Sequence, residues 1–291
     1  MTTTLSRSRG DALILIAALI WGVAFYFQKT AMSHIGPFLF LAMRGLIAAI
    51  VLTPFARLEQ RNRNHSAPNV IPWALFGGML FFTAGAIQQF GIVTASVTNT
   101  GFLTALYVVV TPFVYWLYKR TPPTAQIWIA VALSTIGIWA LSGGALSTFT
   151  AGEWLVAGSS LLWATFFVAT GEAARCDQPI TYTCVQFYFV GAVAIAFAWA
   201  FEPIVWADIL LSLNSILYVG ILSSALTFAI MASALRHISA PRASVLLSIE
   251  TVFAAAAGYL LLGERLDALA WFGAGLILSA ILVLRVKPGS T

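Results

Sequence analysis

The chain has 291 residues, of which 60% are apolar and only 9% are Asp, Glu, Lys or Arg. Soluble domains carry about 25% charged residues, and a water-exposed surface needs such groups to stay soluble. The composition therefore excludes an ordinary soluble globular protein. The net charge of +5 does not point to nucleic acid, because the basic residues flank apolar runs, which is a signal of membrane topology.

Apolar runs follow one another through the whole chain, and a helix of about 20 largely apolar residues is long enough to cross a bilayer. The runs are continuous rather than alternating, which favours helices over a transmembrane β-barrel. We therefore predict an all-α integral membrane protein with ten transmembrane helices. In chain order the predicted spans are 12–33, 38–56, 70–93, 97–118, 124–143, 152–172, 180–201, 207–234, 241–262 and 267–285.

The distribution of lysine and arginine orients these spans, because cytoplasmic loops are enriched in both residues. With the N-terminus in the cytoplasm, Lys29 and Arg44 fall inside spans and Arg265 falls on the outer side. All the other basic residues then lie on the cytoplasmic side: Arg7, Arg9, Arg57, Arg61, Arg63, Lys119, Arg120, Arg175, Arg236, Arg242, Arg285 and Lys287. We expect both termini to be cytoplasmic. The first run is long for a cleaved signal peptide and contains Lys29, so we expect it to be retained as a span.

The second half of the sequence repeats the first at a shift of 142 residues. The pairs matched by this shift include Trp21 with Trp163, Phe25 with Phe167 and Pro37 with Pro179. Matched residues in one ungapped register indicate duplication, which divides the chain into repeats at 1–147 and 148–291. Because five spans are an odd number, the two repeats must have opposite topology, an arrangement that recurs in secondary transporters.

Three segments resemble the EamA-type proteins of the drug/metabolite transporter superfamily. They are ALIWGVAF (18–25), TASVTNTGFLTALYVVVTPFVYWLYKRTPP (94–123) and SIETVFAAAAGYLLLGERL (248–266). The resemblance covers nearly the whole chain and is nearest to bacterial amino-acid exporters, including exporters of aromatic amino acids. It implies transport without ATP across the bacterial inner membrane, through a central cavity between the repeats.

The chain departs from the family pattern in its second half. The family usually has a proline after the acidic residue of the 248–266 segment, whereas Glu250 is followed here by Thr251. This departure puts in doubt the helix bend expected there. Pro112 keeps the corresponding bend of the first half.

Charged residues inside spans are candidates for function, because each costs at least about 2.5 kcal/mol at the membrane centre. Lys29 is near the outer end of its span and is more simply explained by extension toward the interface. Arg44 lies deeper and could bind a substrate carboxylate or hold helix ends through carbonyl groups. Glu250 could meet a substrate ammonium group, exchange a proton, or bond to a neighbouring helix.

Stripes of aromatic and polar residues on several spans are the second candidate feature. They could be packing or lipid-facing residues, but an apolar cavity with a few polar groups is typical of a small-molecule site. We expect spans 1, 3, 4, 6, 8 and 9 to form its walls. The predicted substrate-binding residues are Trp21, Phe25, Arg44, Phe82, Gln89, Asn99, Phe102, Tyr107, Trp163, Phe167, Ser244 and Glu250.

Other classes of function find less support in the sequence. Its three histidines, His34, His65 and His237, fall in loops or at helix ends, and no HExxH, GxSxG or phosphate-binding glycine motif occurs. We therefore expect no catalysis, cofactor or bound metal. A channel would need a continuous polar path, for which the spans offer few residues.

The sequence thus predicts a secondary transporter that exports small amphipathic metabolites by alternating access. Amino acids, including aromatic ones, are the favoured substrates. The alternatives are a carrier for another metabolite or drug class and, with less support, a channel or an intramembrane enzyme. One acid inside a span permits proton coupling without requiring it.

Overall fold

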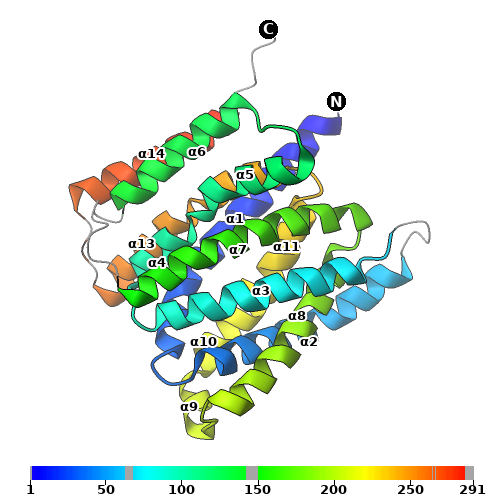
Figure 1. Ribbon diagram of the computed structural model, residues 1–291, viewed down its shortest axis with the longest axis vertical. Helices are drawn as coiled ribbons and strands as arrows, with labels where there is room; N and C mark the ends of the chain where they lie inside the picture. The colour runs from blue at the N-terminus through cyan, green and yellow to red at the C-terminus, as the bar shows by residue number, and fades with distance from the viewer. Residues whose placement is uncertain (1, 63–67, 142–149, 264, 266, 286–291) are drawn as a thin grey trace.

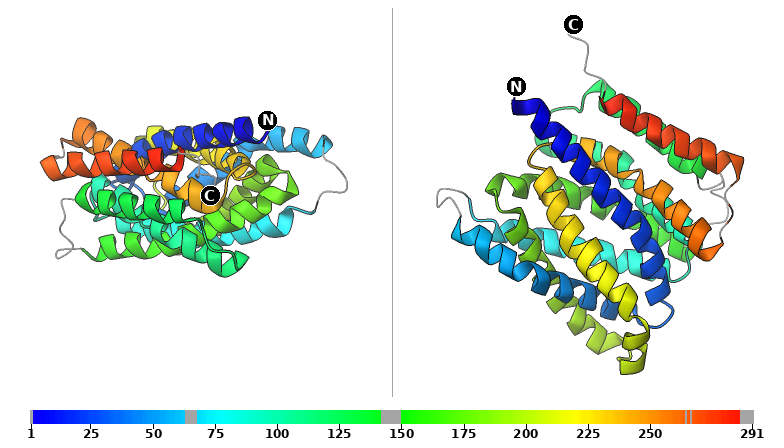
Figure 2. Two further views of the ribbon diagram at one scale, coloured as in Figure 1. Left: turned by 90° about the horizontal axis from the view of Figure 1, so that it is seen from above. Right: turned by 180° about the vertical axis from the view of Figure 1, so that it is seen from behind.

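The computed structural model describes residues 2–62, 68–141, 150–263, 265 and 267–285, with side chains from residue 8 to residue 284 of these ranges. All regular secondary structure in this part of the chain is helical. The helices pack as a tilted bundle (Figure 1), with α1 on one face and α7 on the other when seen from front and back (Figure 2). The N-terminal end of α1 and the C-terminal end of α14 lie at the same end of the bundle (Figure 2).

The helices of the first repeat follow the predicted order, and the predicted fourth span is broken into two helices. Its elements are α1 (Thr2–Ala31), α2 (Pro37–Arg61), α3 (Ile71–Ile92), α4 (Val97–Thr104), α5 (Tyr107–Lys119) and α6 (Ala125–Leu141). Elements α4 and α5 together form the broken span.

The second repeat has the same order, with breaks in two spans. Its elements are α7 (Ala151–Ala173), the 3₁₀ turn η1 (Ala174–Cys176), α8 (Pro179–Phe201), α9 (Trp206–Leu211), α10 (Leu213–Leu217), the π-helical segment η2 (Tyr218–Leu226), α11 (Thr227–Ala234), α12 (Ala240–Leu247), α13 (Glu250–Leu262) and α14 (Ala268–Arg285). Each apolar run predicted from the sequence coincides with helix in the described part of the chain.

Eight helical segments of the described chain are long and apolar enough to cross a membrane. Ala125–Leu141 and Ala268–Leu284 are also apolar but fall short of that length. The chain is therefore an all-helical, multi-pass membrane protein. The predicted boundary between residues 147 and 148 lies outside the described residues, as do Arg63, His65 and Lys287.

Helices α2 and α8 are repeat counterparts, and each begins at the predicted proline, Pro37 or Pro179. A proline fits this first turn because the amide there has no intrahelical partner. The two helices make the most extensive helix–helix contact in the described chain. A Cβ on Gly45 would lie 3.1 Å from the Gly191 nitrogen, so the absence of a side chain at Gly45 favours the close approach of the two backbones there.

Each of these two helices caps the other with a carboxylate. Glu202, just after α8, accepts from the Phe38 and Leu39 amides of α2 at 2.8 Å each. Glu59 of α2 accepts from the Ile180 and Thr181 amides of α8 at 3.1 and 2.6 Å. Carboxylates satisfy the free amides and the positive dipole at a helix N-terminus. Because each C-terminal part meets the partner's N-terminus, α2 and α8 run antiparallel.

The fourth and ninth spans break at equivalent places, after Thr104 and after Leu247. The second helix break occurs even though Thr251 stands where the family usually has a proline. The break therefore does not require a proline at this position. Ser248 Oγ donates to the Val245 carbonyl at 2.6 Å and Thr251 Oγ1 donates to the Ser248 carbonyl at 2.8 Å. Hydroxyl groups that bond to nearby carbonyls compete with the helical ladder and bend helices.

Candidate functional site

A cavity lies at the centre of the bundle, between the two repeats. Its lining residues are Trp21, Phe25, Gln28, Arg44, Gln88, Thr104, Tyr107, Trp163, Phe167, Ser223, Phe228 and Glu250. They come from spans 1, 3, 4, 6, 8 and 9, as expected, and also from span 2. The cavity volume is about 50 Å³, whereas small-molecule pockets measure roughly 300–1,000 Å³. The helices must therefore move apart before a metabolite can enter.

Arg44 of α2 provides positive charge at this cavity. It is only 4% exposed, and its Nε donates to Ser224 Oγ at 2.9 Å while its Nη1 donates to Gln28 Oε1 at 3.3 Å. The guanidinium carbon lies 5.5 Å from the centre of the Phe81 ring. These partners are all neutral, so the protein groups that the structure describes around Arg44 do not compensate its charge. A buried charge of this kind is costly unless it is paired.

Glu250 provides a carboxylate on another wall. It is the first residue of α13 and is only 2% exposed. The Tyr107 hydroxyl donates to Glu250 Oε1 at 2.9 Å. Gly22 of α1 lets the two helices come together here, because a Cβ at this position would lie 2.6 Å from the Glu250 carbonyl oxygen. The Tyr107 hydroxyl is a neutral partner, so the Glu250 carboxylate is suited to a cationic group.

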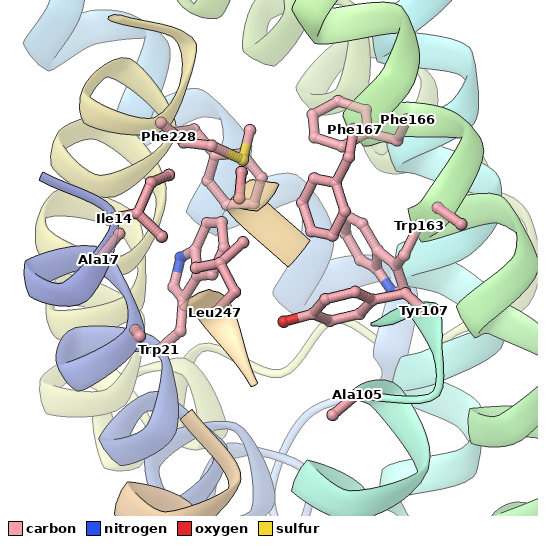
Figure 3. Close-up of a cluster of buried hydrophobic side chains, with 14 of the residues drawn as sticks. Ile14, Ala17, Trp21, Ala105, Tyr107, Trp163, Phe166, Phe167, Phe228 and Leu247 are labelled. Atoms are coloured by element: carbon pink, nitrogen blue, oxygen red, sulfur yellow. The ribbon is translucent and has the colours of Figure 1, made fainter. Parts of the chain in front are cut away.

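Aromatic rings form most of the remaining wall. Figure 3 shows Trp21 on α1 facing Tyr107, Trp163 and Phe167 from the other side. Trp21 stacks on Phe167 with ring centres 6.5 Å apart and lies 4.7 Å from Phe228. Such rings suit flat apolar groups, and their faces also attract cations.

A second cavity of about 450 Å³ opens where α5 and α7 end and α12 begins. We call it the vestibule. Glu172 pairs there with Lys119 and, at 3.2 Å, with Arg175, while Asp177 pairs with Arg236. Its lining includes Val168, next in sequence to Phe167 of the central cavity.

Seven of the predicted binding residues line the central cavity: Trp21, Phe25, Arg44, Tyr107, Trp163, Phe167 and Glu250. The other five lie elsewhere in the bundle. Gln89 donates to Gln28, which places it directly behind the cavity wall. Phe102 is buried in the apolar core, and Ser244 Oγ donates to the Pro241 carbonyl at 2.9 Å.

The remaining two predicted residues have structural partners. Phe82 packs against Phe38 and Phe197 with ring centres 6.2 and 5.3 Å apart. Asn99 Nδ2 donates to Glu153 Oε1 at 2.5 Å. Lys29 is the remaining charged residue that was predicted to lie inside a span. Its Nζ donates to the Ile92 and Val93 carbonyls at the end of α3, both at 2.9 Å.

Sequence reasoning missed five residues of the cavity: Gln28, Gln88, Thr104, Ser223 and Phe228. Gln28 continues the stripe of Trp21 and Phe25 at helical spacing, so periodicity could have identified it. Gln88 donates to Thr104 Oγ1 at 2.7 Å, a contact between separate spans that no local pattern encodes.

Comparison with known proteins identifies the class. The EamA-like transporter family matches the chain twice, over residues 8–143 and 150–286. The chain belongs to this family, which occurs in it as two repeats.

Several curated relatives are named as transporters. An "Uncharacterized transporter" of Archaeoglobus fulgidus is 26% identical over 97% of this chain and 87% of its own length. YwfM of Bacillus subtilis is 25% identical over 94% of this chain and 93% of its own. A crystal structure with 15% sequence identity covers 96% of both chains with a TM-score of 0.77, which supports the fold. We conclude that the chain is a transporter.

Proposed function

We propose that the protein is a secondary carrier that exports amino acids, including aromatic ones, by alternating access. One observation carries this proposal: a guanidinium group, on Arg44, and a carboxyl group, on Glu250, line different walls of one aromatic cavity, each beside neutral partners. An amino acid is complementary to this arrangement. Its carboxylate would pair with Arg44, its ammonium group with Glu250, and its side chain would lie among the rings.

The repeat architecture supports the transport mechanism. We propose that the two shorter helices, α6 and α14, also cross the membrane, which gives ten spans together with the eight longer helices. We further propose that the two repeats have opposite topology. The antiparallel pair of α2 and α8 supports this inversion, because these helices are repeat counterparts. Two such repeats can expose a central site to each side in turn.

The proposed orientation places both termini in the cytoplasm of a bacterium, with the protein in its inner membrane. The vestibule is then the cytoplasmic approach to the cavity, since Lys119, Arg175 and Arg236 lie on the predicted cytoplasmic side. Glu250 could also carry a coupling proton when the substrate is absent. A carrier for another metabolite or drug class is the alternative.

The test uses purified protein in liposomes and a panel of labelled amino acids. The amino acid that exchanges best is chosen. It and the corresponding amine, which lacks the carboxylate, are then compared as unlabelled competitors of the labelled amino acid. In the wild type the amino acid should compete about tenfold better, because a hydrogen-bonded charge pair contributes about 1.5 kcal/mol or more.

The variant Arg44→Gln should remove this difference. Arg57→Gln removes the same charge from an exposed site on the same helix, so it should preserve the difference. An equal advantage of the amino acid over the amine in Arg44→Gln and in the wild type would contradict the assignment of Arg44. Exchange of a different class of metabolite, with no exchange of amino acids, would favour the alternative carrier.

A further inference from the structure

Trp163 carries a buried hydrogen-bond donor that has no acceptor among the residues that the structure describes. The residue lies on α7 in the cavity wall and is 7% exposed. Within the described residues, its indole Nε1 has no hydrogen-bond partner. An indole N–H that is buried normally finds an acceptor, and leaving it without one is destabilising. Trp163 lines the cavity, so helix movement that opens the cavity to a ligand would offer it this donor.

Its repeat counterpart shows that the structure can satisfy such a group. Trp21 Nε1 donates to the Ser223 carbonyl at 2.9 Å. Both tryptophans line the same cavity from opposite sides (Figure 3). Among the described residues the Trp21 donor has an acceptor and the Trp163 donor has none, so the two positions differ chemically although the repeats match in sequence there.

The surroundings of Trp163 indicate which part of a substrate it meets. Its ring contacts Phe81 and Phe166 edge-on, with centres 5.2 and 5.7 Å apart. Within the cavity lining, Trp163 lies beside Phe228, with ring centres 6.5 Å apart, and in the proposed binding mode the charged ends of an amino acid are held by Arg44 and Glu250. The side chain of the substrate then remains to face the indole.

We infer that Trp163 Nε1 donates a hydrogen bond to an oxygen atom on the side chain of the substrate. This inference rests on the proposed function and narrows its substrate class. The cavity selects amino acids whose largely apolar side chains carry a hydroxyl or another oxygen acceptor. Their hydrocarbon isosteres fit the same space but leave the indole N–H unpaired.

The experiment compares matched competitors against the labelled amino acid in proteoliposomes. The pairs are tyrosine with phenylalanine and threonine with valine, which differ mainly in the hydroxyl group. In the wild type, the hydroxylated member of at least one pair should compete about fivefold better, since one neutral hydrogen bond gives an effect of this order. This comparison requires no variant, so it tests the inference even where a substitution prevents folding.

Trp163→Phe keeps an aromatic ring and removes the donor, so the preference should fall to about one while the hydrocarbon member is still transported. Trp154→Phe makes the same change at a 64% exposed position of the same helix and should preserve the preference. The inference is overturned if the wild type shows no preference, or if the preference survives in Trp163→Phe. It is also overturned if Trp163→Phe weakens both members equally, which would assign the N–H to a protein acceptor in another conformation. Absence of competition by any amino acid would overturn the proposed function itself, and the inference with it.

Discussion

Tyr107 of the first repeat and Glu250 of the second bond to each other in the cavity wall, with the Tyr107 hydroxyl 2.9 Å from Glu250 Oε1. Each is the first residue of the second helix in a broken span, α5 or α13. The hydrogen bond therefore joins the two repeats at the site where substrate is proposed to bind. Movement of the repeats relative to each other must change or break this contact.

Removing the donor should impair transport. Tyr107→Phe keeps the ring against Phe167, whose centre is 4.8 Å away, but leaves the buried Glu250 without this partner. We expect exchange of the transported amino acid to fall about tenfold, because hydrogen bonds to charged groups contribute about 1.5 kcal/mol or more. The measurement is exchange in proteoliposomes. Tyr118→Phe, at a 54% exposed position of the same helix, is the matched control, and equal loss in both variants would count against the role of this bond.

Glu250 should determine recognition of the ammonium group. The wild type should favour an amino acid over the carboxylic acid that lacks its amino group by about tenfold in competition. In Glu250→Gln the paired charge is lost, so this ratio should approach one. Asp208→Asn removes an acidic charge from α9, outside the cavity lining, and should leave the ratio unchanged. A preserved ratio in Glu250→Gln would reject the assignment.

The reciprocal caps between α2 and α8 should stabilise the fold independently of each other. Glu59→Gln and Glu202→Gln each weaken two bonds to a helix N-terminus, and each should lower the free energy of unfolding by about 1 kcal/mol. The two sites are about 30 Å apart along the helices, so the effects should add in the double variant. Thermal unfolding in detergent measures this. An unchanged melting temperature in either single variant would show that its cap is unimportant.

The helices, their order and their repetition could be predicted because each depends on local composition. Pro37 and Pro179 mark helix starts through their own backbone chemistry. The break before Glu250 was harder to predict, since it depends on hydroxyl groups of Ser248 and Thr251 rather than on a proline.

The cavity was predicted best where a helix has a polar or aromatic stripe, as at Trp21, Phe25 and Arg44. On α3 we predicted that Phe82 and Gln89 face the cavity. The cavity is lined instead by Gln88, one position before Gln89. This helix is apolar on nearly all sides, so periodicity gave little information about which side faces inward.

Other features depend on contacts between distant segments. Ser223 contributes a backbone carbonyl to Trp21 from the π-helical segment η2, a role that its side chain does not encode. Asn99 combines a polar side chain with a position near the cavity helices, yet it bonds to Glu153 of α7. A polar residue within a span predicts a partner, but the sequence alone does not say whether that partner is substrate or protein.

The central claim is that one buried site is exposed alternately to the two sides of the membrane. Counterflow tests this most directly: liposomes containing the purified protein are loaded with an unlabelled amino acid and diluted into a trace of the labelled one. We expect a transient accumulation of label above its external concentration, because an alternating site must exchange one bound substrate for another. Label that only equilibrates, together with single-channel currents across a planar bilayer, would contradict it.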